Sequence, residues 1–250
     1  MSASADSPLT VVLLSPAPVP GKALPWLIGP WQPRQVASVH THMLTCTMMR
    51  LAKLLPAEAG HRHVLAVAGL DEALKRLHVP SEAGSWQWID QGQGPLGQRL
   101  SDIWRALPDS PMAFFQFDSV DPPASWLRAL PSRLSATDLL IGPTSDGRGG
   151  AGGGSGSGRR GAAGSRDREV GFWLIAGRRW PRQWLAGIDW QEANVYHQGK
   201  RIARALGLSV EECPACPPIA RPRDLAALRQ RLAGSDDADL LRLEQALGRL

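Results

Sequence analysis

The sequence of 250 residues predicts an α/β fold in which helices cover both faces of one mostly parallel sheet. Three observations predict it. Short, continuously apolar runs recur along the chain, as expected for strands that are buried on both faces. Segments with apolar residues at helical spacing separate these runs. Turn residues such as Gly, Pro and Asp follow most of the runs, where the carboxyl ends of parallel strands would lie.

The first apolar run, 9–14, is bounded by Pro8 and by Ser15-Pro16 and predicts a buried strand. Apolar residues at helical spacing predict a helix over 34–55, and Pro56 ends it. Further strands are expected at 63–68, 85–90, 112–117, 138–141, 170–176 and 209–213. Further helices are expected at 71–77, 96–107, 122–134, 191–206, 224–232 and 236–247.

Residues 147–165 contain ten Gly and no apolar side chain larger than Ala. Such a segment buries too little surface to offset the entropy lost on ordering it. We therefore predict a flexible insert at about 147–168 inside a single domain that spans 1–250. The core of this domain is expected at about 9–232, followed by a C-terminal helical extension at 233–250.

Charge and cysteine content exclude several classes of function. The formal net charge of the chain is +5. Residues 147–169 contain five Arg and two acidic residues, so this segment carries +3 of the total. The rest of the chain carries only +2, which is too little to favour a nucleic-acid partner.

Cys213 and Cys216 form a Cys-Pro-Ala-Cys pair that lacks the second half of a zinc site. The N-terminus has no long apolar segment typical of a signal peptide or membrane span. We expect a cytoplasmic protein without a membrane span.

The strongest candidate site follows the apolar run that ends at Phe117. Asp118 and Asp121 stand there three positions apart. A divalent cation that bridges a diphosphate needs hard oxygen ligands on a rigid element, and carboxylates supply them. We interpret Asp118 as a residue that faces the ligand. Asp121 is either a second metal ligand or the N-cap of a helix that begins near Pro122.

Two glycine-containing loops follow other predicted strands. Gly92 and Gly94 precede a predicted helix, where backbone N–H groups and the helix N-terminus favour a phosphate. An ordinary tight turn would show the same pattern. Pro20, Gly21 and Lys22 follow the first strand and supply one cation, although a solvated lysine in a loop is the plainer interpretation.

Taken in order, several blocks resemble one bacterial family. They are Pro18-Val19-Pro20-Gly21, Gln91–Leu100, Asp118-Ser119, Gly142–Gly147, Gly171–Ile175, Ile188-Asp189-Trp190 and Arg223-Asp224-Leu225. Their order and spacing over 9–232 are similar to those of the GT-A-like glycosyltransferases known as domain of unknown function 2064, or radical-SAM/selenodomain-associated transferases. The resemblance implies a GT-A fold, of the nucleotide-diphospho-sugar transferase type, and metal-dependent transfer from a nucleotide-diphospho-sugar donor to an acceptor.

The resemblance also implies roles for individual residues. Pro20, Gly21, Lys22, Gly92, Gly94 and Arg99 would contact the donor. Asp118 and Asp121 would hold Mg²⁺ or Mn²⁺. Asp146 would position the acceptor or act as a base.

The sequence departs from the family at polar positions and keeps its apolar strands. The Lys-Thr-Arg-Leu stretch of the family is replaced by Ala23–Leu27, and its late Asp-x-Asp by Ile219–Arg221. Pro95 replaces the Asp that the family has in the glycine turn, and Phe117 replaces the glycine that the family has before Asp118. Loss of polar residues with a retained core is also what a catalytically degenerate GT-A-like binding or partner protein would show.

Overall fold

The computed structural model describes residues 8–107, 110–144, 171–178, 182–191 and 195–250. The predicted insert at 147–168 and the candidate Asp146 lie outside the described residues.

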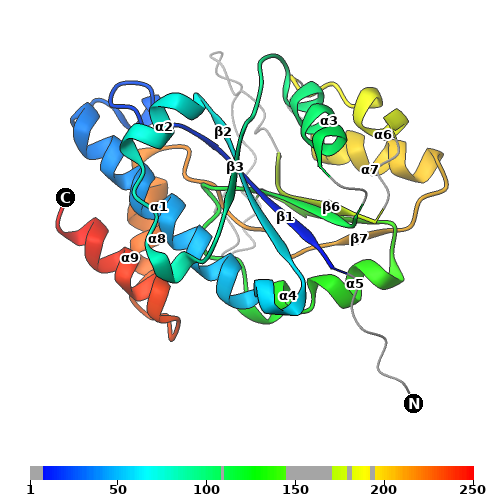
Figure 1. Ribbon diagram of the computed structural model, residues 1–250. Helices are drawn as coiled ribbons and strands as arrows, with labels where there is room; N and C mark the ends of the chain where they lie inside the picture. The colour runs from blue at the N-terminus through cyan, green and yellow to red at the C-terminus, as the bar shows by residue number, and fades with distance from the viewer. Residues whose placement is uncertain (1–7, 108–109, 145–170, 179–181, 192–194) are drawn as a thin grey trace, which may run out of the picture.

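Within this part of the chain, seven strands form one sheet in the order β3-β2-β1-β4-β6-β5-β7 (Figure 1). The strands are β1 Thr10–Pro16, β2 Arg62–Ala68, β3 Gln87–Asp90, β4 Met112–Gln116, β5 Leu139–Pro143, β6 Phe172–Gly177 and β7 Val210–Glu212. All neighbours pair in parallel except β6, which runs antiparallel to both β4 and β5. The mostly parallel sheet confirms the predicted fold class.

The helices surround the sheet on both faces. They are α1 Pro33–Leu54, α2 Leu70–Arg76, α3 Leu96–Ala106, α4 Ala124–Arg128, α5 Leu130–Ala136, α6 Arg182–Gly187, α7 Val195–Ala205, α8 Pro222–Leu232 and α9 Ala238–Gly248. Short 3-10 turns occupy Pro25–Leu27, Ala57–Ala59 and Ser81–Ala83. Figure 1 shows α3, α6 and α7 on one side of the sheet and α1, α8 and α9 on the other. Among the described residues, no helix is both long enough and apolar enough to span a bilayer.

The prediction of a single helix at 122–134 is wrong, because the structure has two helices there, α4 and α5. The consecutive prolines Pro122 and Pro123 delay the start to Ala124, since a residue before proline avoids helical angles. Pro131 then stands in the first turn of α5, where its missing N–H is tolerated at a helix start but not in a helix interior.

Two apolar cores lie on the two faces of the sheet. Side chains of β1 alternate between them: Val11 and Leu13 pack with α1, whereas Val12 and Leu14 pack toward α3 and α7. Because β1 pairs with both β2 and β4, it is central and its side chains from Thr10 to Ser15 are buried. Six strands, all except β6, run in the same direction, so the carboxyl ends of these strands meet at one edge of the sheet. Ligands bind at this edge in sheets of this type.

Candidate functional site

Asp118 lies two residues beyond β4, at the carboxyl edge of the sheet, and it is only partly exposed. Burial raises the pKa of its carboxyl to about 6, and the hydrogen bond from its own backbone N–H opposes this shift. Within the described residues no cationic side chain pairs with this carboxylate. A partly buried acid without a cationic partner in the described part of the chain is available to a ligand that carries positive charge.

The Asp121 carboxylate forms an ion pair with Arg231. Arg231 on α8 donates from Nε to Oδ2 at 2.6 Å and from Nη2 to Oδ1 at 3.1 Å. The thiol of Cys216 lies 3.9 Å from Oδ1. The interpretation of Asp121 as a helix cap is wrong, because α4 begins after Pro123 without a side-chain cap. To coordinate a cation with either oxygen, Asp121 would have to weaken its pair with Arg231.

Arg50 on α1 fixes the loop that carries both aspartates. Its side chain is 4% exposed and donates from Nη1 to the Val120 carbonyl at 2.7 Å and from Nη2 to the Pro122 carbonyl at 3.0 Å. Its Nε donates to Asp237 Oδ2 at 2.8 Å. The sequence interpretation missed this residue. A signal was present, because an arginine among the buried positions of an apolar helix face needs partners inside the protein.

The loop after β3 holds the predicted phosphate-binding glycines. Gly92 and Gly94 have φ of 77° and 99°, in the left-handed region that favours glycine, and a β-carbon at either would meet open space. The Gly92 N–H already donates to Asp90 Oδ1 at 2.9 Å. Arg99 on α3 donates to the Gln91 side chain, which in turn donates to the Ala66 carbonyl at 3.1 Å. The loop is thus an ordered turn, and none of the described residues packs against Gly92 and Gly94 on its outer side. One N–H group of Arg99 is used to hold Gln91 in this loop.

The loop after β1 contains Pro20, Gly21 and Lys22, all of them exposed. Gly21 has φ of 82°, and the N–H of Lys22 closes the turn on the Val19 carbonyl at 3.0 Å. Lys22 therefore lies at the carboxyl edge of the sheet and is exposed to solvent.

Trp26 takes a position that the sequence interpretation did not assign to the site. It stands within Ala23–Leu27, where the resembled family carries basic residues, and the residue is 50% exposed. Its indole Nε1 donates to the Ile219 carbonyl at 3.0 Å, and the Ile219 N–H donates to the Asp118 carbonyl at 3.3 Å. A single residue thus links the indole to the backbone of Asp118. An exposed, fixed aromatic ring can stack on a planar ligand.

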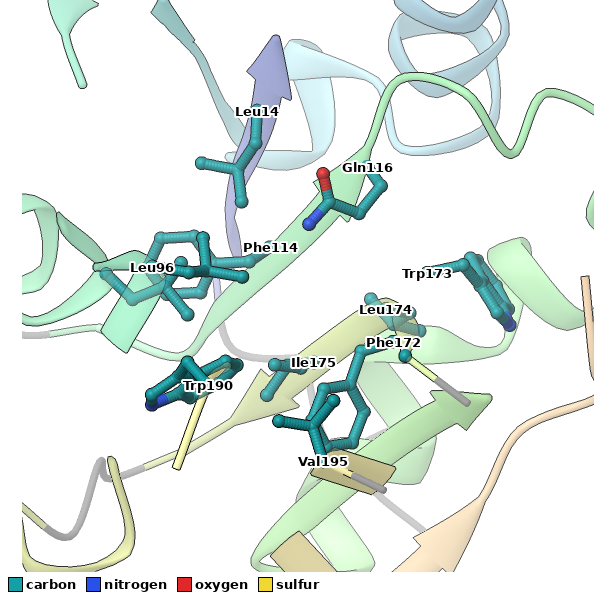
Figure 2. Close-up of a pocket in the computed structure, with 12 residues that line it drawn as sticks. Leu14, Leu96, Phe114, Gln116, Phe172, Trp173, Leu174, Ile175, Trp190 and Val195 are labelled. Atoms are coloured by element: carbon teal, nitrogen blue, oxygen red, sulfur yellow. The ribbon is translucent and has the colours of Figure 1, made fainter. Parts of the chain in front are cut away.

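A cavity of about 140 Å³ lies on the sheet face beneath α3, at the carboxyl-terminal halves of β1 and β4 (Figure 2). It is lined by Leu14, Leu96, Leu100, Phe114, Gln116, Gly171, Phe172, Trp173, Leu174, Ile175, Trp190 and Val195. Figure 2 shows the Gln116 amide projecting toward this space from the end of β4. The cavity therefore adjoins the strand end that carries Asp118.

The sheet order and the loops at its carboxyl edge define the nucleotide-diphospho-sugar transferase-like fold. A protein from Desulfovibrio desulfuricans G20 that is described as a nucleotide-diphospho-sugar transferase superimposes with a TM-score of 0.73 at 22% identity, over 96% of each chain. A 4-diphosphocytidyl-2C-methyl-D-erythritol synthase superimposes with a TM-score of 0.53 at 12% identity, over 90% of this chain and 98% of that one.

The bifunctional IspDF from Campylobacter jejuni gives a TM-score of 0.52 at 12% identity, over 88% of this chain and 54% of that one. No protein-family model and no curated protein matches the sequence. The structural likenesses show the fold.

Proposed function

We propose that the protein binds a nucleotide-activated donor, a nucleotide-diphospho-sugar or a related molecule, and transfers the activated group to an acceptor. The observation that carries the proposal is Asp118, a partly buried carboxylate without a cationic partner in the described chain, at the strand end where this fold class binds ligands. The likeness to a nucleotide-diphospho-sugar transferase over nearly the whole chain supports the choice of donor.

The residues present fit one divalent cation held between protein and ligand. Mg²⁺ is commonly bound by one or two carboxylates together with phosphate oxygens of the substrate. Asp118 would supply the protein ligand, and the donor diphosphate would supply the others. No group of three metal-binding side chains exists among the residues that the structure describes, so an all-protein metal cage is not part of the proposal. When bound, Mg²⁺ or Mn²⁺ would stabilise the negative charge that develops on the leaving diphosphate.

The chain's own residues then bind and orient the donor. Lys22 brings a solvated positive charge to the edge where the diphosphate would lie. The face of Trp26 offers a stacking surface for the base. Gly94, with open space around it, lets backbone approach a phosphate closely. The role of Asp146 in positioning the acceptor or accepting its proton stays a prediction.

A second function, donor binding without transfer, is favoured by one specific observation. Asp121 and Arg99, two of the predicted polar ligands, are engaged with Arg231 and Gln91. A protein with these groups satisfied internally would retain the fold and the strand-end carboxylate but lack part of the catalytic set.

Calorimetric titration with UDP, GDP, CDP and ADP, each with and without Mn²⁺, tests the proposal. We expect binding of at least one nucleotide that requires Mn²⁺ and is lost in Asp118→Asn. Asp102→Asn is the matched control, because Asp102 is half exposed on α3 and paired with Arg105. Absence of binding across the panel contradicts both functions.

Transfer and binding alone are then separated with the donor that binds. Slow release of free nucleoside diphosphate from the bound donor supports a transferase, whereas complete recovery of intact donor supports the binding protein.

A further inference from the structure

The cavity beneath α3 is a second candidate site, next to the proposed donor site. We propose that it binds a small cyclic apolar group, and that this group belongs to the acceptor. The identity of the occupant as acceptor rests on the proposed function, whereas the binding of a ring does not. The proposal stands on three features: the rigidity of the walls, the chemistry of the lining and the position of the single side-chain amide.

The aromatic wall of the cavity is fixed by packing and hydrogen bonds. The ring of Phe172 lies 5.9 Å from that of Trp190 and 5.9 Å from that of Tyr196. The indole of Trp190 donates to the Leu185 carbonyl at 3.0 Å. A β-carbon on Gly97 would stand 2.1 Å from the Trp190 indole nitrogen, so this glycine is what allows Trp190 to lie against α3. Walls held in this way do not collapse into the space between them, and the cavity is preformed.

The side chains that face the cavity are apolar except at one point. Eight lining side chains belong to the apolar core on this face of the sheet, whereas those of Trp173 and Leu174 belong to the core on the opposite face. The indole N–H groups of Trp173 and Trp190 are directed to the Pro214 and Leu185 carbonyls. Gln116 is the exception. Its amide makes no hydrogen bond to the other residues that the structure places, and it projects toward the cavity (Figure 2).

The position of Gln116 connects the cavity with the proposed donor site. It is the last residue of β4, and Asp118 follows two residues later. A ligand that fills the cavity and bonds to the Gln116 amide would therefore place its polar end toward the Asp118 carboxylate. An acceptor needs this arrangement, because its nucleophilic group must meet the donor at the metal–diphosphate site.

The size of the cavity selects the class of ligand. An apolar protein cavity of about 150 Å³ is known to stay dry and to bind benzene, and about 140 Å³ is available here. A six-membered ring with one hydroxyl or carbonyl group fits this volume and satisfies Gln116. A nucleoside, with its base and polar ribose, exceeds the volume and would leave the ribose hydroxyls against apolar walls.

Ligand-observed NMR and calorimetric titration with phenol and with benzene test the proposal on the intact protein. We expect saturable binding of both probes, with phenol bound more tightly. Gln116→Met keeps the length of the side chain without a branch at Cγ and removes the amide, and should weaken phenol about tenfold, as expected for one lost hydrogen bond, while benzene changes less than about twofold. Leu96→Trp fills the cavity from the start of α3 and should weaken both probes more than about tenfold.

Leu74→Trp is the matched control, because Leu74 is 59% exposed on α2 and a tryptophan there should leave both titrations unchanged. If Leu96→Trp does not fold, Val195→Phe fills the cavity from the opposite wall. Lack of saturable binding by either probe, or binding that the filling variant leaves intact, overturns the proposal.

A third titration, of phenol in the presence of Mn²⁺ and saturating nucleotide, tests the acceptor assignment. Simultaneous binding supports it, and displacement of phenol by the nucleotide overturns it. If no nucleotide binds at all, the proposed function fails, and the two probe titrations still decide whether the cavity binds a ring.

Discussion

Arg231 holds the Asp121 carboxylate through two hydrogen bonds, at 2.6 and 3.1 Å, and thereby separates the roles of two aspartates that are three residues apart. Asp118 has no such partner among the described side chains, and burial raises its pKa. The pair therefore divides into one carboxylate that stabilises the loop and one that is available to a ligand.

The first prediction concerns this division. Asp121→Asn should lower the free energy of unfolding by about 1–2 kcal/mol, because it leaves a partly exposed, charge-assisted pair without its negative partner. Nucleotide binding in the presence of Mn²⁺ should change less than about threefold, since Asp121 is not expected to hold the cation. Urea denaturation and calorimetry measure the two quantities. Equal loss of binding in Asp118→Asn and Asp121→Asn would instead identify both as ligands.

A second prediction concerns Arg50. Arg50→Met should destabilise the protein by about 3–5 kcal/mol, because it leaves a carboxylate and two carbonyls without their buried donor. Arg105→Met, at an arginine whose side chain is 51% exposed, should change stability by less than about 0.5 kcal/mol. Chemical denaturation of both variants measures the difference, and similar stabilities would show that the buried network contributes little.

His40 gives a third prediction, on pH. Its Nε2 lies 2.8 Å from Ser15 Oγ and its ring stacks on Phe117 at 4.1 Å. Burial lowers the pKa of His40 to about 4, so the folded protein holds the neutral ring. The resulting stability is fully present above pH 6.5 and is lost as the pH falls toward 4, by at most about 3 kcal/mol. His40→Gln should flatten this part of the stability profile, which unfolding at a series of pH values measures; an unchanged slope would show that His40 does not cause it.

The fourth prediction concerns Trp26. Trp26→Ala should weaken nucleotide binding by about 5- to 150-fold, since stacking on one base contributes about 1–3 kcal/mol, and Trp26→Phe should retain part of it. The fold should tolerate both changes because the residue is half exposed. Calorimetry with the nucleotide that binds the wild-type protein gives the affinities. Leu74→Ala is the control on an exposed apolar residue, and wild-type affinity in Trp26→Ala would exclude the ring from the site.

Apolar runs predicted the strands because burial of both faces leaves a local signal in the sequence. The direction of β6 could not be predicted in this way, since an apolar run has the same pattern whichever way the strand runs. Local steric rules explain the division into α4 and α5, and attention to Pro131 would have found it.

The site was less predictable because its contacts are distant in sequence. Asp118 and the glycine loops were named from local patterns, whereas Arg231 pairs with Asp121 across 110 positions and Arg50 reaches Asp237 across 187. Trp26 could be assigned to the site only after folding had brought Ile219 between it and Asp118.

The pH dependence of Mn²⁺-dependent nucleotide binding tests the role of Asp118 most directly. The cation requires the ionised carboxylate, and burial places the pKa of Asp118 at about 6. We therefore predict that affinity is constant above about pH 7 and falls about tenfold per pH unit below 6, with binding absent at every pH in Asp118→Asn. Retention of Mn²⁺-dependent binding in Asp118→Asn, or the same affinity at pH 5 and pH 7 in the wild-type protein, would contradict the assignment of Asp118 as the metal ligand.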